Sequence, residues 1–157
     1  MKKFLIVPFA MLVAGSAFAT KDLSKTFDIT ADIPTDAFQI ISDTGWDSAP
    51  QVLVYNSMTE TLAPIQQRYQ AKSTTGAISA KLNGVPQINS GADAILLDVE
   101  LNGIKLTNAA VEVISKADAG SPTFMPIRVS AQTGKYQPGS YTGSISMTFE
   151  TPLVAAP

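Results

Sequence analysis

Polar and apolar residues alternate without interruption near the start of the chain, in the stretch TFDITADIPTD at residues 26–36. The apolar positions share one parity: Phe27, Ile29, Ala31 and Ile33. The polar positions share the other: Asp28, Thr30 and Asp32. A period of two is typical of a β-strand with one buried face, so we expect a strand over residues 26–33. The pattern does not tell whose sheet this strand completes.

Short apolar or alternating runs recur along the rest of the chain, separated by Gly, Pro, Asn and Ser, whereas helical periodicity is nearly absent. Regular short strands with turn signals between them are typical of an all-β sandwich. We therefore expect an all-β fold. After the first strand, the expected strands span residues 38–41, 51–55, 62–72, 76–82, 94–101, 104–106, 110–115, 126–132 and 140–150.

The clearest hairpin signal is ILLDVELNGIKL, residues 95–106. Asn102 and Gly103 are residue types that accept the two positive φ angles of a type I′ turn. Three apolar residues before the turn alternate with Asp98 and Glu100, which predicts one wet face. A flexible surface loop is the alternative interpretation of the Asn-Gly pair.

The last expected strand, residues 140–150, has the most regular alternation. One face carries Tyr141, Gly143, Ile145, Met147 and Phe149. Ser and Thr occupy the other face, and Pro152 ends the strand because proline cannot donate to a ladder. The chain therefore has a strong strand near each end. An ordinary sandwich would pair the two internally, and periodicity does not exclude that.

The first nineteen residues have the features of a secretion signal. Lys2 and Lys3 precede the apolar stretch 4–13, and a small-x-small sequence ends at Ala19. We expect cleavage between Ala19 and Thr20. A membrane anchor is the alternative, but the apolar run is short for a bilayer and contains Pro8.

The amino-acid composition limits the classes of partner that this protein can have. Removal of the first 19 of 157 residues leaves 138, enough for one domain, with nine basic and thirteen acidic residues and a net charge of −4. The sequence has no basic cluster, so we expect no nucleic-acid partner, and no second apolar run of transmembrane length, so we expect no membrane span in the mature chain. Without cysteine, stability must come from burial or from association with other chains.

The sequence offers no support for an enzyme, a cofactor or a metal site. There is no histidine to activate a hydroxyl, no G-x-S-x-G or S-x-x-K motif, no phosphate-binding glycine loop and no calcium loop. Carboxylates such as Asp98 and Glu100 fall on the polar sides of expected strands, where solvated faces explain them. We therefore predict no catalytic, cofactor-binding or metal-ligating residues.

Aromatic residues leave two binding hypotheses open. Trp46 and Tyr55 would suit a sugar-stacking surface, although aromatic residues are mostly at least partly buried. Arg68 beside Tyr69 suits a cation–π or anion site, although its flanks have the polarity of an exposed strand face. A self-contained secreted binding module, lectin-like and with its first strand in its own sheet, is therefore the alternative function.

Three stretches carry a resemblance to a known family. Residues 27–34 have an apolar-x-apolar-x-Ala-x-apolar pattern that runs into a proline, and residues 138–147 have a glycine–aromatic–glycine start to a terminal strand. Residues 62–81 contain an Arg-Tyr pair followed by a lysine in a short strand. With these features the mature sequence resembles the major pilins of the alternate chaperone–usher (class 5) fimbriae, the colonisation factor antigen family.

The resemblance implies an immunoglobulin-like sandwich that lacks its final strand and receives it from a neighbouring subunit. It implies a signal peptide at 1–19, an N-terminal donor-strand extension at 20–34 and an incomplete pilin domain at 35–157. The expected function is that of the major structural subunit of an adhesive fimbria, exported through the periplasm to the bacterial cell surface. The implied partners are copies of itself, a periplasmic chaperone, an outer-membrane usher and a tip adhesin.

The resemblance also assigns roles to residues. The donor strand would present Leu23, Phe27, Ile29, Ala31 and Ile33. The acceptor groove would be lined by Tyr141, Ile145, Met147 and Phe149, which also suit an ordinary core. The chain runs on from Glu150 to Pro157, a departure from the family that leaves the role of this tail open.

Overall fold

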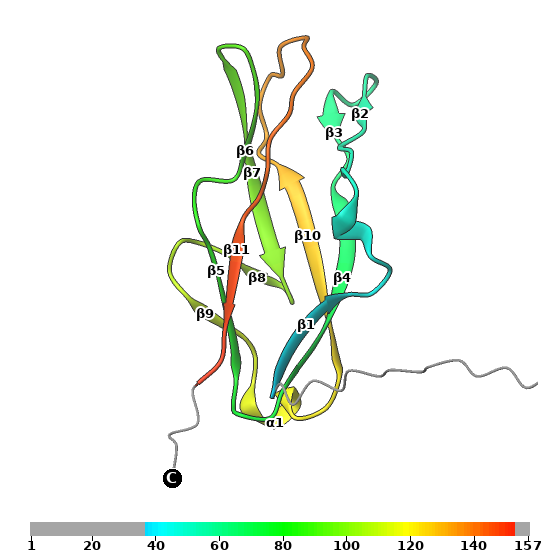
Figure 1. Cartoon of the computed structure of the whole chain (residues 1–157). Helices are drawn as coiled ribbons and strands as arrows, with labels where there is room; N and C mark the ends of the chain where they lie inside the picture. The colour runs from blue at the N-terminus through cyan, green and yellow to red at the C-terminus, as the bar shows by residue number, and fades with distance from the viewer. Residues whose placement is uncertain (1–36, 153–157) are drawn as a thin grey trace, which may run out of the picture. The chain divides into compact units, whose positions relative to one another are not determined.

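A computed structural model describes residues 37–152 of the chain, and these residues form two antiparallel sheets and a separate hairpin (Figure 1). The larger sheet has the order β1-β4-β10-β7-β6, with β8 paired to β7, and the smaller sheet has the order β11-β5-β9. The strands are β1 (Phe38–Ser42), β2 (Tyr55–Asn56), β3 (Thr61–Leu62), β4 (Ile65–Ser73), β5 (Ile78–Leu82), β6 (Gln87–Ser90), β7 (Asp93–Leu101), β8 (Ile104–Lys105), β9 (Val111–Ile114), β10 (Thr123–Ala131) and β11 (Met147–Glu150). A 3-10 helix, η1 (Trp46–Ser48), and one short helix, α1 (Lys116–Ala119), lie in connections.

The core forms between the inward faces of the two sheets. Alternate residues of β4, β5, β7 and β10 are buried, as a period of two requires. Ile78, Leu101 and Met125 are each 0% exposed, and Val99 is 1% exposed. Burial of apolar area of this kind is the main source of stability in a described region that has no disulfide.

The predicted hairpin at residues 95–106 is confirmed. Leu101 pairs with Ile104, so the loop has two residues, and Asn102 and Gly103 have φ angles of 50° and 79°. These angles are those of a type I′ turn, whose twist matches that of the flanking strands. The Asn102 side chain donates to the Val113 carbonyl at 2.6 Å, which ties the turn to β9 of the other sheet.

Several expected boundaries are wrong. Residues 51–54 are not a strand, because Val52 and Val54 are 73% and 62% exposed and have no sheet to join; only Tyr55 and Asn56 pair, in the β2–β3 hairpin. The strand expected over 62–72 is interrupted before β4 at Ala63 and Pro64. β6 and α1 were not predicted, since β6 lies between glycine and proline breaks and α1 has a single turn.

The last expected strand is shorter than its alternation suggests. Only Met147–Glu150 form a regular strand, β11, and residues 140–146 are irregular apart from one bridge between Asn89 and Thr142. The reason is that this part of the chain passes from one sheet to the other (Figure 1). Its backbone bends between two partners and does not follow one regular ladder.

Candidate functional site

The last part of the domain, residues 139–152, is called the terminal segment below, and its start is bonded to β6. Thr142 and Asn89 exchange two backbone hydrogen bonds of 2.8 and 3.0 Å. A Cβ atom built on Gly143 would clash with the Gln87 carbonyl oxygen, so only glycine fits this approach. Gly143, which the sequence pattern placed on the apolar strand face, therefore has a packing role that the pattern did not reveal.

Farther along, the terminal segment is bonded to β5. The Asn83 amide donates to the Ser146 carbonyl at 3.0 Å, and the Asn83 side chain donates to the Ser146 hydroxyl at 2.8 Å. β11 then continues the ladder, with Met147 opposite Leu82. One edge of the terminal segment is therefore bonded to β6 at Thr142 and to β5 from Ser146 onward.

The end of the terminal segment is tied to the turn after β4. The Thr151 hydroxyl lies 2.7 Å from the Ser73 hydroxyl and 3.0 Å from the Thr75 hydroxyl. Pro152 packs so closely on Gly76 that a Cβ atom there would lie 3.0 Å from the proline ring. These contacts account for the first residues beyond Glu150, while the tail at 153–157 lies outside the described residues.

The opposite edge of the terminal segment faces away from β5 and β6. In an antiparallel pair the backbone bonds of successive residues alternate between the two edges. Thr142 and Ser146 bond to the β6–β5 side, and β11 continues the ladder from Ser146, so Met147 and Phe149 direct their N–H and C=O groups to the other side. Gly143 and Ile145 have no backbone hydrogen-bond partner among the described residues. This edge is free within residues 37–152.

The side chains of the same odd-numbered residues lie on the core side. Each predicted groove residue is partly buried and packs against the core: Tyr141, Ile145, Met147 and Phe149. Met147 and Phe149 thus combine a side chain at the core with a backbone that faces the free edge, and Ile145 adds a partly buried side chain and a backbone without a partner among the described residues. The structure therefore places the four predicted residues on the core side of the terminal segment.

A second free edge belongs to β1 of the larger sheet. Ala37 accepts a bond of 2.7 Å from the Thr74 amide, and the Asp43 amide donates to the Arg68 carbonyl at 3.2 Å, so odd-numbered residues of β1 bond to β4. Phe38 and Ile40 consequently direct their backbone groups away from β4, while their side chains pack against the core and remain partly exposed. The sequence predicted β1 as a strand but did not predict that it borders the acceptor groove. The alternation of Phe38 and Ile40 was the only feature of the sequence that could have indicated this role.

Aromatic contacts place the two free edges on the same side of the sandwich. The ring of Tyr69, on β4 beside β1, lies 5.7 Å from the ring of Phe149 on β11 and 5.0 Å from that of Trp46. Burial, with a smaller effect of the Asp47 charge, raises the pKa of Tyr69 to about 12. Trp46 also donates to the Arg68 carbonyl at 3.0 Å, so it is a packing residue and not a free sugar-stacking platform.

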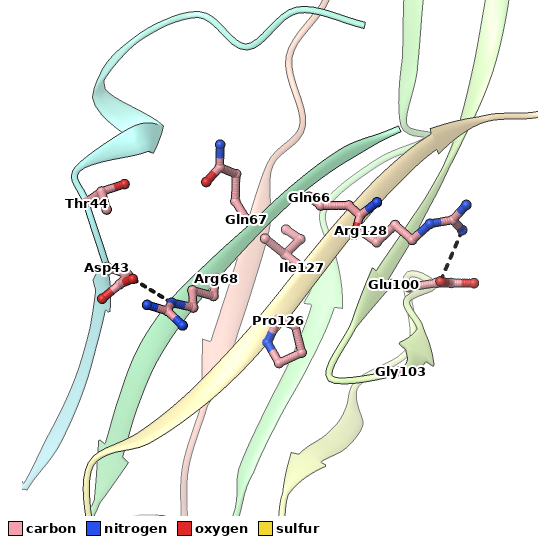
Figure 2. Close-up of a pocket in the computed structure, with 10 residues that line it drawn as sticks. All are labelled: Asp43, Thr44, Gln66, Gln67, Arg68, Glu100, Gly103, Pro126, Ile127 and Arg128. Atoms are coloured by element: carbon pink, nitrogen blue, oxygen red, sulfur yellow. Dashed lines mark hydrogen bonds and ion pairs between the residues drawn. The ribbon is translucent and has the colours of Figure 1, made fainter. Parts of the chain in front are cut away.

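Arg68 lies in a shallow pocket on the outer face of the larger sheet, which Figure 2 shows. Its guanidinium is 2.5 Å from the Asp43 carboxylate and 4.4 Å from the centre of the Phe124 ring. The second arginine of the pocket, Arg128, lies 3.5 Å from Glu100. Both cations of this pocket are therefore paired with carboxylates, which disfavours an anion site and agrees with an exposed strand face.

The other predicted site residues lie outside the described part of the chain. These are the cleavage residues Ala19 and Thr20 and the donor residues Leu23, Phe27, Ile29, Ala31 and Ile33. In the described residues no helix is long and apolar enough to cross a membrane, and no group of metal-ligating side chains was found.

Comparisons with known proteins add to this geometry. A family model described as CS1 type fimbrial major subunit matches residues 23–150. The fold is similar to that of the CooA pilin subunit from enterotoxigenic Escherichia coli, with a TM-score of 0.61 and 16% sequence identity over 73% of this chain and 87% of that chain. A search of curated proteins gave no significant match. The all-β pilin sandwich predicted from the sequence is confirmed, and the absence of one strand is consistent with the free edges.

Proposed function

Because this chain belongs to the family of CS1 type fimbrial major subunits, we propose that its residues 20–34 complete the sandwich of a neighbouring copy. The family makes it a structural subunit of a fimbria, polymerised with copies of itself at the cell surface. The proposal adds the mechanism, in which the extension of one subunit enters the free edge of the next. This head-to-tail contact does not close on itself, so it builds a filament.

The observation that carries the proposal is the free edge of the terminal segment. Gly143 and Ile145 leave their backbone groups without partners among the described residues, while Ile145 and Met147 remain only partly buried at the core. A strand added at an open edge supplies ladder hydrogen bonds, and its alternate side chains fill the apolar positions. An acceptor site of this kind needs unpaired backbone groups and incompletely buried apolar side chains on the same residues. Ile145 has both features.

The N-terminal extension has the complementary pattern. Burial of Phe27, Ile29 and Ile33, with a smaller contribution from Ala31, would stabilise the contact by roughly 5–8 kcal/mol before the cost of ordering the segment. A shift of one residue would bury Asp28 and Asp32 in place of these side chains, so the charges set the register. Leu23 has the same parity as the apolar set and extends it.

The same open edge explains why assembly would need helper proteins. An incomplete sandwich exposes apolar side chains and unpaired backbone groups, which favour aggregation. We infer that a periplasmic chaperone first supplies a strand at this edge and that an outer-membrane usher exchanges it for the extension of the next subunit. A separate tip adhesin would then end the fibre, leaving this chain as the repeated stalk subunit.

One substitution pair tests the proposal. We expect Ile29→Asp to abolish fibre formation, because it places a charge in the apolar acceptor site. Thr30→Asp is the matched control, since it introduces the same charge one residue away on the outward side of the donor strand. The measurement is gel electrophoresis of unheated and boiled samples, in which a fibre gives a heat-sensitive ladder, together with electron microscopy.

Other outcomes of this experiment would contradict the proposal. Normal fibres from Ile29→Asp would contradict the proposal, as would equal loss of fibres from both variants. A stable wild-type monomer that never forms a ladder would favour the secreted binding module.

A further inference from the structure

An exposed apolar patch lies on the β2–β3 hairpin and the residues that lead into it. Four residues form this hairpin patch, with exposed fractions of 73% for Val52, 62% for Val54, 50% for Tyr55 and 94% for Met58. Scattered apolar residues are ordinary on protein surfaces, but here four fall within seven consecutive residues. The patch is therefore a candidate contact surface.

Contacts of Asn56 and Tyr55 hold the tip and one side of the hairpin. The Asn56 side-chain oxygen accepts the amides of Met58 at 2.9 Å and Thr59 at 3.3 Å, which closes the tip. The ring of Tyr55 lies 6.4 Å from that of Tyr136 at an angle of 83°, so the hairpin rests against the loop after β10. A preformed surface loses little conformational freedom when a partner covers it.

The hairpin patch lies at the opposite end of the sandwich from the start of β1 (Figure 1). β3 leads through residues 63–64 into the first residue of β4, whereas Ala37 accepts a bond from Thr74, just after the last residue of β4. α1 lies at that second end, because Asp118 accepts a bond of 3.0 Å from Thr123 at the start of β10. We call these ends the hairpin end and the extension end.

Donor-strand exchange, on which this inference rests, would bring opposite ends of consecutive subunits together. The terminal segment runs from the hairpin end to the extension end, so an antiparallel donor leaves the acceptor at its hairpin end, after Ile33. Residues 34–36 alone separate Ile33 from Ala37. Four residue steps span at most about 14 Å. The extension end of the next copy must therefore lie close to the hairpin end of the acceptor.

We propose that the hairpin patch is a second interface between consecutive subunits, covered by the extension end of the next copy around α1. The exposed surface there includes Ala117 and Pro122, whose small apolar side chains suit contact with the patch. The occupant is thus another copy of this chain, held in place by the short linker. The contact restricts the angle between neighbouring domains. With the donor strand alone, only the linker of residues 34–36 would determine this angle.

The first test uses the unaltered protein. Met58 is exposed and Met125 is 0% exposed, so oxidation of Met58 by peroxide reports its accessibility while Met125 serves as an internal reference. We expect Met58 to oxidise several-fold more slowly in fibres than in monomers complemented with a synthetic peptide of residues 20–34. Equal rates in the two samples would overturn the proposed interface.

The second test identifies the partner surface. The sequence has no cysteine, so a Met58→Cys, Ala117→Cys double variant places single thiols at the two surfaces. A short bis-maleimide should link its fibres into a ladder that survives boiling, while each single variant gives at most pairs. Val85→Cys with Ala117→Cys is the control, because Val85 is 67% exposed but lies in the connection between β5 and β6.

The outcomes separate this inference from the function on which it rests. Fibres of the first double variant that give no covalent ladder would overturn the second interface and leave donor-strand exchange intact. Equally efficient linking of the Val85 control would also overturn the second interface. If the wild-type chain forms no fibres with its extension present, donor-strand exchange itself fails.

Discussion

The two sides of the sandwich have the same alternating sequence pattern but very different burial. Where β7 and β10 lie in the middle of the larger sheet, Leu101, Val99 and Met125 are 0–1% exposed. On the side bordered by β1 and the terminal segment, Phe38 and Ile145 remain partly exposed. β7 and β10 each have a neighbouring strand on both edges, and we call this part of the sandwich the closed side. Among the described residues, β1 and the terminal segment each have a neighbour on one edge only, and we call that part the open side. An apolar face of this kind is complete only when it has a neighbour on both edges.

The largest effect is expected on the closed side. Leu101→Ala should lower the free energy of unfolding by about 2–5 kcal/mol, because it removes a fully buried side chain and leaves a cavity. Denaturant unfolding of the subunit, complemented with the peptide of residues 20–34, measures this. Leu96→Ala on the same strand is the control, since Leu96 is 43% exposed. Equal losses from the two variants would contradict the burial that defines the closed side.

A second variant separates the terminal segment from β6. Gly143→Ala should destabilise the complemented subunit by roughly 1–3 kcal/mol, because its methyl group would clash with the Gln87 carbonyl. Gly134→Ala is the matched control, with nothing within 4 Å of its added carbon. The measurement is again the denaturant midpoint. An unchanged midpoint for Gly143→Ala would mean that the terminal segment does not need its bond to β6.

The open side is tested by comparing one variant in two states. Ile145→Ala should cost roughly 1–2 kcal/mol more in the peptide-bound subunit than in the free subunit, because only the added strand completes the burial of this side chain. Thermal unfolding with and without the peptide gives the two values. Leu101→Ala should cost the same in both states. If Ile145→Ala did so too, the partly buried face would be ordinary core.

The smallest effect at neutral pH is expected from the ionisation of Tyr69, at the junction of the two sides. Its pKa is raised from 10.0 to about 12 by burial, so the folded state favours the neutral phenol. Stability from this group should be complete below pH 10 and be lost as the pH rises towards 12. Unfolding midpoints of the wild type and Tyr69→Phe over that range measure the difference. A difference that does not depend on pH would contradict the raised pKa.

Much of the architecture follows from local pattern. The strand β7 and the Asn102–Gly103 turn could be predicted from the sequence, because each depends on a few neighbouring residues. The stretch before β2 was wrongly predicted as a strand, since Val52 and Val54 are residue types that favour strands but have no sheet beside them. Local pattern reports which face is apolar, but it does not report whether a partner strand is present.

The candidate site was predictable in part for the same reason. The parity of Tyr141, Ile145, Met147 and Phe149 followed from alternation, and their role followed from family resemblance. The contribution of Phe38 and Ile40 was missed because free backbone groups depend on the order of strands in the sheet. The close approach of Gly143 to Gln87 was missed because the two residues are far apart in the chain.

The terminal segment also has a consequence for the folding rate. Its bonds join residues far apart in sequence: 69 positions separate Lys81 from Glu150, and 78 separate Ser73 from Thr151. Closing such long loops costs entropy before any contact compensates for it, and folding slows as contacts become less local. We therefore expect the terminal segment to dock late in the folding of the domain. Until it docks, the edge that would receive another strand does not exist.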